Sequence, residues 1–376
     1  MPRFATEFSP RRPNSRQRHG LLSAICRFES GCRATFFLFA RGNAGEVFAI
    51  SSGVRPLVSF VIPVRNDVQR LRRCLTSIVS NDYPRALIEI IVVDNESEDG
   101  SGRAAREYGA IVLRASGTCV AELRNRGARA ALGSIIAFAD ADHEIDMQWI
   151  TAAVAILSSS DVAATGCAYL ADPNANWVQR QYDRLRVRPD RREEVAWIGS
   201  GNFAVKRQAF ERVGGFNTAL TACEDVDLCN RLRQAGFRIV ADPALRSVHF
   251  GDPRTLKALF FGELWRGRDN LKVTFSGPRT FRHLRSALLP VADLAILAAG
   301  IVSALTGHPV VAVACLAMAL LPAAARAAVM TRRPTTGGDQ GFGRGAAQAL
   351  AVSVVFDLAR AFALLARGSH RARRAA

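Results

Sequence analysis

The chain has 376 residues, of which 49% are hydrophobic and 22% charged, and its formal net charge is +17. This apolar fraction excludes whole-chain disorder, and the length allows two or three domains. The charge lies mostly at the ends, since residues 1–55 hold nine Arg and three Glu and residues 326–376 hold nine Arg and two Asp. A nucleic-acid-binding protein more often carries its basic residues on the folded domain, whereas this arrangement favours an anionic membrane surface and no nucleic-acid partner.

Residues 1–55 predict a basic extension. Arginines lie among Pro and Ser residues between positions 10 and 18, and the apolar run 34–40 is too short to span a bilayer. Its flanks do not resemble a cleaved signal peptide. We therefore expect residues 1–55 to be disordered, and a wrongly assigned start codon would give the same pattern.

From residue 57 onward, strand patterns alternate with helix patterns. Short β-branched and apolar runs predict strands at 58–62, 88–93, 111–113 and 134–139. Amphipathic segments predict the intervening helices at 68–80, 101–108 and 120–131. Such alternation builds a mostly parallel sheet with helices on both faces. We therefore predict an α/β domain of the Rossmann-like class over residues 56–275.

Apolar helices are expected in residues 276–376. The stretches 287–305 and 309–325 each approach the ~20 residues needed to cross hydrocarbon, and Arg residues flank the pair. A membrane hairpin (287–325) with both ends in the cytosol satisfies the positive-inside rule. A third stretch, 345–366, contains an Asp and an Arg one helical turn apart, and we expect an interfacial or re-entrant helix there. A buried, soluble helical subdomain is the alternative for all three stretches.

Acidic residues gather where the predicted strands end. In a parallel sheet, ligands bind beyond the carboxyl ends of the strands. Asp140 and Asp142 directly follow one strand, and two carboxylates so close together favour a divalent cation, Mn²⁺ or Mg²⁺, that would bridge to a substrate diphosphate. Asp94 ends another strand and can accept hydrogen bonds from a base or a ribose. A solvated acidic turn or a turn cap is the alternative for each.

A further acidic cluster, at residues 224–227, begins a helix that Gly236 closes. Acidic residues in a first helical turn interact favourably with the helix dipole, so a structural role alone would explain them. The functional alternative is that one of these carboxylates deprotonates an acceptor hydroxyl as a general base.

The order of these features is that of a known enzyme family. From Val58 to about Asp242, the chain resembles a family 2 glycosyltransferase with the GT-A fold. The resemblance is carried by seven short segments, at 58–67, 89–100, 124–127, 138–142, 199–202, 213–216 and 224–228. Each segment alone has modest specificity, but together and in this order they are highly specific.

The resemblance implies a site for a nucleotide-sugar donor. Pro63, Asn66 and Asp67 would line the nucleotide pocket. Asp94 would contact a uracil-like base, and Arg124 would lie near the diphosphate. A UDP-sugar is therefore the expected donor.

The same resemblance implies the metal and the catalytic groups. Asp142 would bind the divalent metal, Asp140 would support the ribose and the metal shell, and His249 stands where some relatives have a further metal ligand. Asp225 would be the catalytic base, and Glu224 would help to hold the acceptor or donor sugar.

Three residues are assigned to the acceptor region, namely Gly201, Asn202 and Trp265. Trp265 would dock the lipid of the acceptor or anchor the chain at the membrane interface. Processive members of the family carry a Q-x-x-R-W motif, which this sequence lacks; its nearest segment is 263–267. We therefore expect the addition of one sugar.

The sequence thus predicts metal-dependent, inverting transfer of a sugar to a hydroxyl of a lipid-linked or cell-envelope saccharide. A disulfide framework is not expected in a chain this long with so large an apolar fraction, so the eight Cys residues favour reduced thiols and a catalytic domain on the cytoplasmic side of the cell membrane.

Two alternatives stay open. A non-catalytic membrane scaffold is compatible with Arg65, which stands where the family commonly has an aromatic residue. A dinucleotide-dependent oxidoreductase is suggested by the G-x-G-x-x-A pattern at 100–105, although the acidic turn before it would repel a pyrophosphate.

Overall fold

The structure is a computed structural model that describes residues 26–30, 33–41, 47–50, 55–276, 281–332 and 342–364. The chain divides into two compact units, Met1–Arg55 and Pro56–Ala376. In the first unit, the strands β1 (Cys26–Ser30), β2 (Arg33–Arg41) and β3 (Val47–Ile50) form an antiparallel sheet. Most of the predicted disordered extension, residues 1–55, lies outside the described residues, so its disorder stays a prediction.

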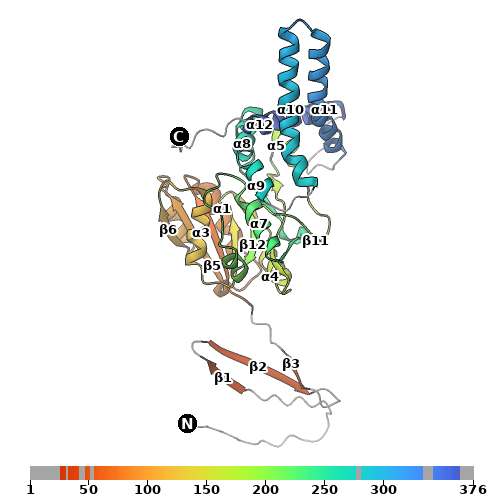
Figure 1. The fold of residues 1–376 in the computed structure, drawn as a ribbon. Helices are drawn as coiled ribbons and strands as arrows, with labels where there is room; N and C mark the ends of the chain where they lie inside the picture. The colour runs from red at the N-terminus through yellow and green to blue at the C-terminus, as the bar shows by residue number, and fades with distance from the viewer. Residues whose placement is uncertain are drawn as a thin grey trace, which may run out of the picture. The chain divides into compact units, whose positions relative to one another are not determined.

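The second unit is built on an eight-stranded sheet with the order β11-β13-β9-β12-β7-β4-β5-β6 (Figure 1). Its strands are β4 (Val58–Val64), β5 (Ile88–Asn95), β6 (Ile111–Ala115), β7 (Ile135–Ala139), β9 (Val162–Gly166), β11 (Glu193–Glu194), β12 (Asn202–Lys206) and β13 (Arg238–Ala241). The strands from β7 to β6 are parallel neighbours, while β12 runs antiparallel to both β7 and β9. The predicted mostly parallel sheet is confirmed.

Helices cover both faces of this sheet. They are α1 (Val68–Val79), α2 (Ser101–Glu107), α3 (Val120–Ala130), α4 (Trp149–Leu157), α6 (Arg207–Arg212) and α7 (Glu224–Gln234). Side chains alternate across a strand, so Phe60 of β4 packs on one face with Leu71 of α1, while Val61 packs on the other with Leu123 of α3. The predicted α/β class, with helices on both faces, is confirmed.

A second, smaller sheet lies beside the carboxyl end of β7. Its order is β10 (Leu170–Ala171), β14 (Ser247–His249) and β8 (His143–Ile145). The antiparallel pairing of β14 with β8 places His249 directly opposite His143. Two short 3-10 helices, Arg85–Leu87 and Pro243–Leu245, complete the described elements of this domain together with α5 (Trp177–Asp183).

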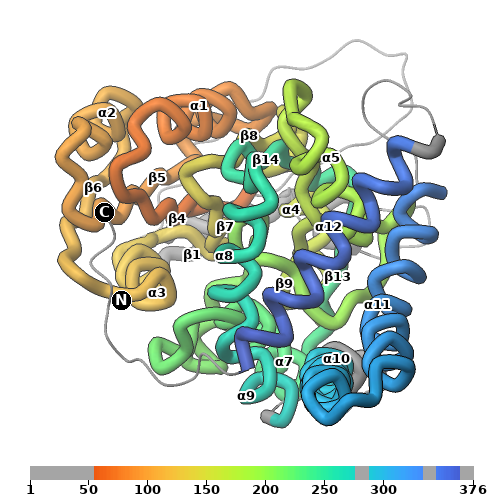
Figure 2. Tube along the Cα trace, turned by 90° about the horizontal axis from the view of Figure 1, so that it is seen from above, coloured from red at the N-terminus to blue at the C-terminus, as the bar shows by residue number. Residues whose placement is uncertain are grey.

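The C-terminal part is helical. It consists of α8 (Leu256–Arg266), α9 (Asn270–Ser276), α10 (Phe281–Leu305), α11 (Pro309–Thr331) and α12 (Phe342–Ala363). Three segments are long and apolar enough to cross a membrane, namely Leu288–Leu305, Pro309–Thr331 and Arg344–Ala363. α10 and α11 form a hairpin that extends away from the sheet (Figure 1). Figure 2 looks down on this hairpin and shows α10 end-on, with α12 extended across the view between α8 and α11.

α12 packs against the α/β domain through apolar and charged side chains. Val352 of α12 lies in one buried cluster with Tyr182 of α5 and Leu259 of α8. Glu263 of α8 is 1% exposed and accepts hydrogen bonds from the Tyr182 hydroxyl (2.6 Å) and from Nε of Arg360 (2.8 Å). The charge of Arg360 therefore joins α12 to α8.

Candidate functional site

Hydrogen bonds join the loops after β4 and β5, and four of the residues predicted to bind the nucleotide lie at these strand ends or in the first of these loops, namely Pro63, Asn66, Asp67 and Asp94. Asn66 adopts φ of 50°, a left-handed conformation that Asn tolerates better than most residues. Its backbone N–H donates to Oγ of Ser97 (3.0 Å), and its side-chain oxygen accepts from the N–H of Glu98 (2.8 Å). The buried carboxylate of Asp94 accepts from the N–H of Ser97 (2.9 Å). The turn after β5 thus brings Asn66 and Asp94 together, and Pro63 lies one strand away from Asp94 in β4.

Arg70, which the sequence motifs do not predict as a site residue, lies between Asp67 and Asp142. Its Nε is 3.3 Å from Oδ1 of Asp67, and its Nη1 is 3.5 Å from Oδ2 of Asp142. Burial raises the pKa of Asp67 above its ordinary value, and the charge of Asp142 acts in the same direction while Arg70 opposes it. Asp67, in the predicted nucleotide loop, and Asp142, the predicted metal ligand, are therefore close enough for their charges to interact.

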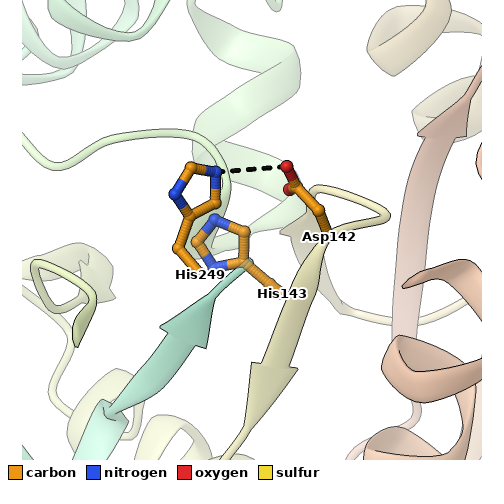
Figure 3. Close-up of side chains that lie close together, drawn as sticks. All are labelled: Asp142, His143 and His249. Carbon is orange, nitrogen blue, oxygen red and sulfur yellow. Dashed lines mark ion pairs between the residues drawn. The ribbon is translucent and has the colours of Figure 1, made fainter. Parts of the chain in front are cut away.

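Asp142, His143 and His249 form a cluster that could hold a metal ion (Figure 3). One ligand atom from each lies within 4.8 Å of the others, and Nε2 of His249 is 3.2 Å from Oδ2 of Asp142. His143 was not predicted, although it follows Asp142 directly in the sequence. The register of β8 and β14 brings it to His249. Two imidazoles and a carboxylate are a donor set that suits a divalent ion.

The surroundings of His249 fix the direction of its ring. Nδ1 of His249 is 2.8 Å from Oδ1 of Asp252, which is itself 4% exposed and paired with Arg186. This contact leaves Nε2 directed at Asp142, as in metal sites where a carboxylate orients a ligating histidine. A Cβ at Gly251 would lie 1.9 Å from Oδ2 of Asp142 and 2.9 Å from Nε2 of His249, so glycine is required for this approach.

Burial and charge set the protonation of the cluster. Burial and the nearby charge of His249 lower the pKa of His143 to about 4, so this imidazole is neutral at pH 7. Burial disfavours the charged form of His249, but hydrogen bonds to Asp142 and Asp252 outweigh it and raise its pKa to about 10. A metal ion that uses Nε2 must therefore displace a proton, because only neutral imidazole is a ligand.

Arg124 connects the carboxyl end of β7 to the start of α7. It is 3% exposed; Nη2 donates to Oδ1 of Asp140 (2.7 Å), and Nη1 donates to Oε1 of Glu224 (2.7 Å). A buried guanidinium needs such partners, because an unpaired charge in the interior is costly. The close spacing of Asp140 and Asp142 predicts a metal ion as their compensating charge, and Arg124 adds a second positive charge at Asp140. Its expected place near the diphosphate stays a prediction.

Asp225 follows Glu224 in the first turn of α7 and is partly exposed. Its carboxylate accepts the N–H of Val226 (2.8 Å), and a Cβ at Gly199 would lie 3.7 Å from its Oδ2. Desolvation by the surrounding protein and the negative charge of Glu224 raise the pKa of Asp225 to about 7. A carboxyl group with this pKa is suited to proton transfer near neutral pH.

The residues assigned to the acceptor region have different surroundings. Asn202 is 1% exposed, and its side chain accepts from Nε1 of Trp149 (2.7 Å) and donates to two backbone carbonyls, so it anchors β12. A Cβ at Gly201 would lie 2.6 Å from Oδ2 of Asp140 and 3.0 Å from Nε2 of His143, which places Gly201 against both. Trp265 is 44% exposed on α8. Contact of these residues with an acceptor stays a prediction.

The G-x-G-x-x-A segment does not offer a pyrophosphate site. It opens α2, whose seven residues follow Gly100 at φ of 87°. The Asp99 carboxylate accepts the N–H of Ser101 (3.0 Å) at this helix start and the N–H of Val68 (2.8 Å) at the start of α1. An acidic side chain therefore occupies the positions where a dinucleotide would bind its phosphates.

Comparisons with known proteins agree with this arrangement. Residues 59–215 match the glycosyl transferase family 2 model, and residues 188–251 match a model described as the N-terminal domain of galactosyltransferase. The chain is 28% identical over 221 residues to glycosyltransferase AglE of Haloferax volcanii, a match that covers 56% of this chain and 69% of AglE. It is 29% identical over 213 residues to the pre-mycofactocin glycosyltransferase of Mycobacterium tuberculosis, covering 53% of this chain and 43% of that protein.

A solved structure supports the fold. The mannosyltransferase PcManGT from Pyrobaculum calidifontis, in complex with GDP-Man and Mn²⁺, has a TM-score of 0.52 and 21% sequence identity, and the match covers 81% of this chain and 88% of that one. The chain is therefore a glycosyltransferase with a family 2 domain on a GT-A-like fold, followed by helices that are apolar enough to cross a membrane.

Proposed function

We propose that the chain transfers a sugar from a nucleotide-sugar donor to a hydroxyl of a lipid-linked or cell-envelope saccharide, with the aid of a divalent metal ion. One observation carries the proposal. The guanidinium of Arg124 donates hydrogen bonds to both Asp140 and Glu224. Asp140 lies two residues before Asp142 of the candidate metal cluster, and Glu224 directly precedes Asp225. This bridge supports the proposal that the candidate metal ligands and the candidate base belong to one site.

In this proposal, Asp142, His143 and His249 hold the metal ion, and Asp140 supports the ribose and the metal shell. When bound, the ion neutralises charge that develops on the leaving diphosphate. Asp252 keeps the His249 ring directed at Asp142. The imidazole nitrogens favour Mn²⁺ over Mg²⁺, because Mg²⁺ prefers oxygen ligands.

Asp225 would accept the proton of the acceptor hydroxyl while the oxygen of that hydroxyl attacks the anomeric carbon of the donor sugar. Attack from the face opposite the leaving diphosphate, in a single displacement, inverts that carbon. Desolvation by the surrounding protein keeps the pKa of Asp225 above its ordinary value, and the charge of Glu224, which Arg124 holds, acts in the same direction. The base therefore retains enough basicity to take a proton near neutral pH.

A panel of nucleotide sugars tests this function. Purified protein with Mn²⁺ or Mg²⁺ is mixed with UDP-, GDP- and other nucleotide sugars, and nucleoside diphosphate release is measured together with the mass of the acceptor. We expect metal-dependent release, a UDP-sugar as the preferred donor, and a mass increase of one sugar. Failure of every donor would favour the non-catalytic scaffold, and a ladder of products would contradict single-sugar addition.

We further propose that the catalytic domain lies on the cytoplasmic side of the cell membrane, with α10 and α11 inserted as a hairpin. α12 would lie at the membrane interface without crossing, which the ion pair from Arg360 to the buried Glu263 supports. A Cβ at Gly267 would lie 2.5 Å from Cβ of Ala363, so the end of α12 packs tightly on the domain.

The position of the C-terminus tests this topology. A C-terminal green fluorescent protein should fluoresce, and C-terminal alkaline phosphatase should be inactive, because both report a cytoplasmic end. As a control, alkaline phosphatase fused after Gly307, at the tip of the hairpin, should be active. An active phosphatase at the C-terminus would show that α12 crosses the membrane.

A further inference from the structure

The turn that leads into α7 has an unusual backbone. Cys223 precedes Glu224 and has φ of 60°, in the left-handed region that non-glycine residues rarely adopt. Such a conformation persists only when its surroundings hold it. Because Cys223 sets the direction in which α7 begins, whatever holds this turn also determines where the carboxylate of Asp225 lies.

A single carboxylate holds the two residues before Cys223. Oδ2 of Asp269 accepts from the backbone N–H of Thr221 (2.7 Å), from the Thr221 hydroxyl (2.8 Å) and from the N–H of Ala222 (3.1 Å). The thiol of Cys223 also donates to the carbonyl oxygen of Arg266 (3.4 Å). Residues 221–223 are therefore held by the end of α8 at Arg266 and by Asp269, in the linker 267–269 between α8 and α9.

This linker is itself fixed by the C-terminal helices. Gly267 packs against Ala363 of α12, and the buried Glu263 of the adjacent α8 forms an ion pair with Arg360. On its other side, the carbonyl of Asp269 accepts the N–H of Val273 and begins α9, which contacts both α7 and α10. Asp269 thus projects from a linker that packs against α12 and leads into α9, and charged acceptors of this kind form stronger hydrogen bonds than neutral ones.

We propose that Asp269 is a positioning residue for sugar transfer, because it holds the left-handed turn at Cys223 and thereby places the Asp225 carboxylate. This inference rests on the proposed role of Asp225. Among the described residues, no hydrogen bond joins Asp269 to Asp225 or to the candidate metal cluster of Asp142, His143 and His249. Its effect should therefore fall on the transfer step and leave donor binding unchanged.

The first test replaces Asp269 by alanine in the full chain. We expect kcat for transfer to fall at least about tenfold, while the KM for the donor and the affinity for Mn²⁺ stay at wild-type values. Asp269→Asn keeps one acceptor oxygen and should have a kcat between those of wild type and Asp269→Ala. If the alanine variant does not fold, the asparagine variant still tests the proposal. Thr255→Ala is the matched control, because it removes a cap from the other end of α8, where Oγ accepts the N–H of Ala258 (3.1 Å). Its kcat should be unchanged.

A second test separates positioning from general stability. Glycine adopts the left-handed conformation without strain, so Cys223→Gly should restore part of the lost kcat in the Asp269→Ala background. A general loss of stability would not be corrected at this one turn. Wild-type kcat in Asp269→Ala, or an equal fall in donor binding, would overturn the proposal.

Asp225→Asn distinguishes the two possible failures. If it lowers transfer while Asp269→Ala does not, only the inference about Asp269 is wrong. If Asp225→Asn keeps the wild-type rate, the proposed function and the inference that rests on it are both wrong.

Discussion

Replacing Asp142 by alanine is expected to abolish metal-dependent release of nucleoside diphosphate from the donor. Asp142 is the carboxylate of the candidate metal cluster, and its Oδ2 lies 3.2 Å from Nε2 of His249 and 3.5 Å from Nη1 of Arg70. Stabilisation of a leaving oxyanion by a metal ion contributes several kcal/mol, and each 1.36 kcal/mol is a factor of ten in rate. Initial rates at saturating Mn²⁺ should therefore fall by about 10³ or more.

Glu144→Ala provides the control for this experiment. Glu144 lies two residues further along and is exposed in β8, so its removal changes the net charge equally without touching the cluster. Its rate should stay within about twofold of wild type, since surface substitutions away from special features have small effects. Diphosphate release by Asp142→Ala at the rate of Glu144→Ala would contradict the metal assignment.

Replacing Asp225 by asparagine is expected to reduce transfer by ~10²–10⁴, the usual contribution of a general base. In the wild-type protein, kcat should rise with pH through the pKa of Asp225, which burial and the charge of Glu224 raise to about 7. The direction follows because only the ionised carboxylate accepts a proton. The amide of the asparagine variant cannot titrate, so this rise should be absent from its pH profile.

Asp227→Asn is the matched control for Asp225. It lies in the same helical turn, but its Oδ2 is paired with Arg231 at 2.7 Å. We expect a kcat close to wild type and an unchanged pH profile. If the two asparagine variants behaved alike, or if Asp225→Asn kept the rise with pH, Asp225 would not be the base.

The α/β domain could be predicted from the sequence where local periodicity determines the element. Helix 68–80 buries Leu71, Cys74 and Ile78 as its amphipathic pattern predicts, and it is observed as Val68–Val79. The antiparallel β12 between β7 and β9 could not be predicted in this way. Its partners lie far away in the sequence, and no local pattern specifies which strands pair.

In the candidate site too, the residues that could be predicted are those that a local sequence pattern places. Asp94, Asp140 and Asp142 could be identified because they follow apolar strands, and Glu224 and Asp225 because they begin a helix.

The missed residues are His143, Arg70, Asp252 and Asp269. They act through tertiary contacts, since His143 meets His249 only through the pairing of β8 with β14. Arg124 was recognised as part of the site, but its pairing with both Asp140 and Glu224 follows from burial, which a sequence pattern does not reveal.

For the last C-terminal helix, α12, the amino-acid composition and the tertiary contacts give different information. Apolar length alone makes Arg344–Ala363 a candidate span. The ion pair of Arg360 with the buried Glu263 also holds this helix against α8. The sequence shows that Arg360 lies in an apolar segment, but it does not show that Arg360 pairs with Glu263, 97 residues earlier.

The most direct test of the central claim is a crystal structure with Mn²⁺ and the nucleoside diphosphate of the preferred donor, measured at the manganese absorption edge. The account predicts one anomalous peak within coordination distance of Asp142 and His249, in contact with the diphosphate and on the same side of the sheet as Asp225. A diphosphate bound without manganese, or manganese bound away from Asp142, would contradict it.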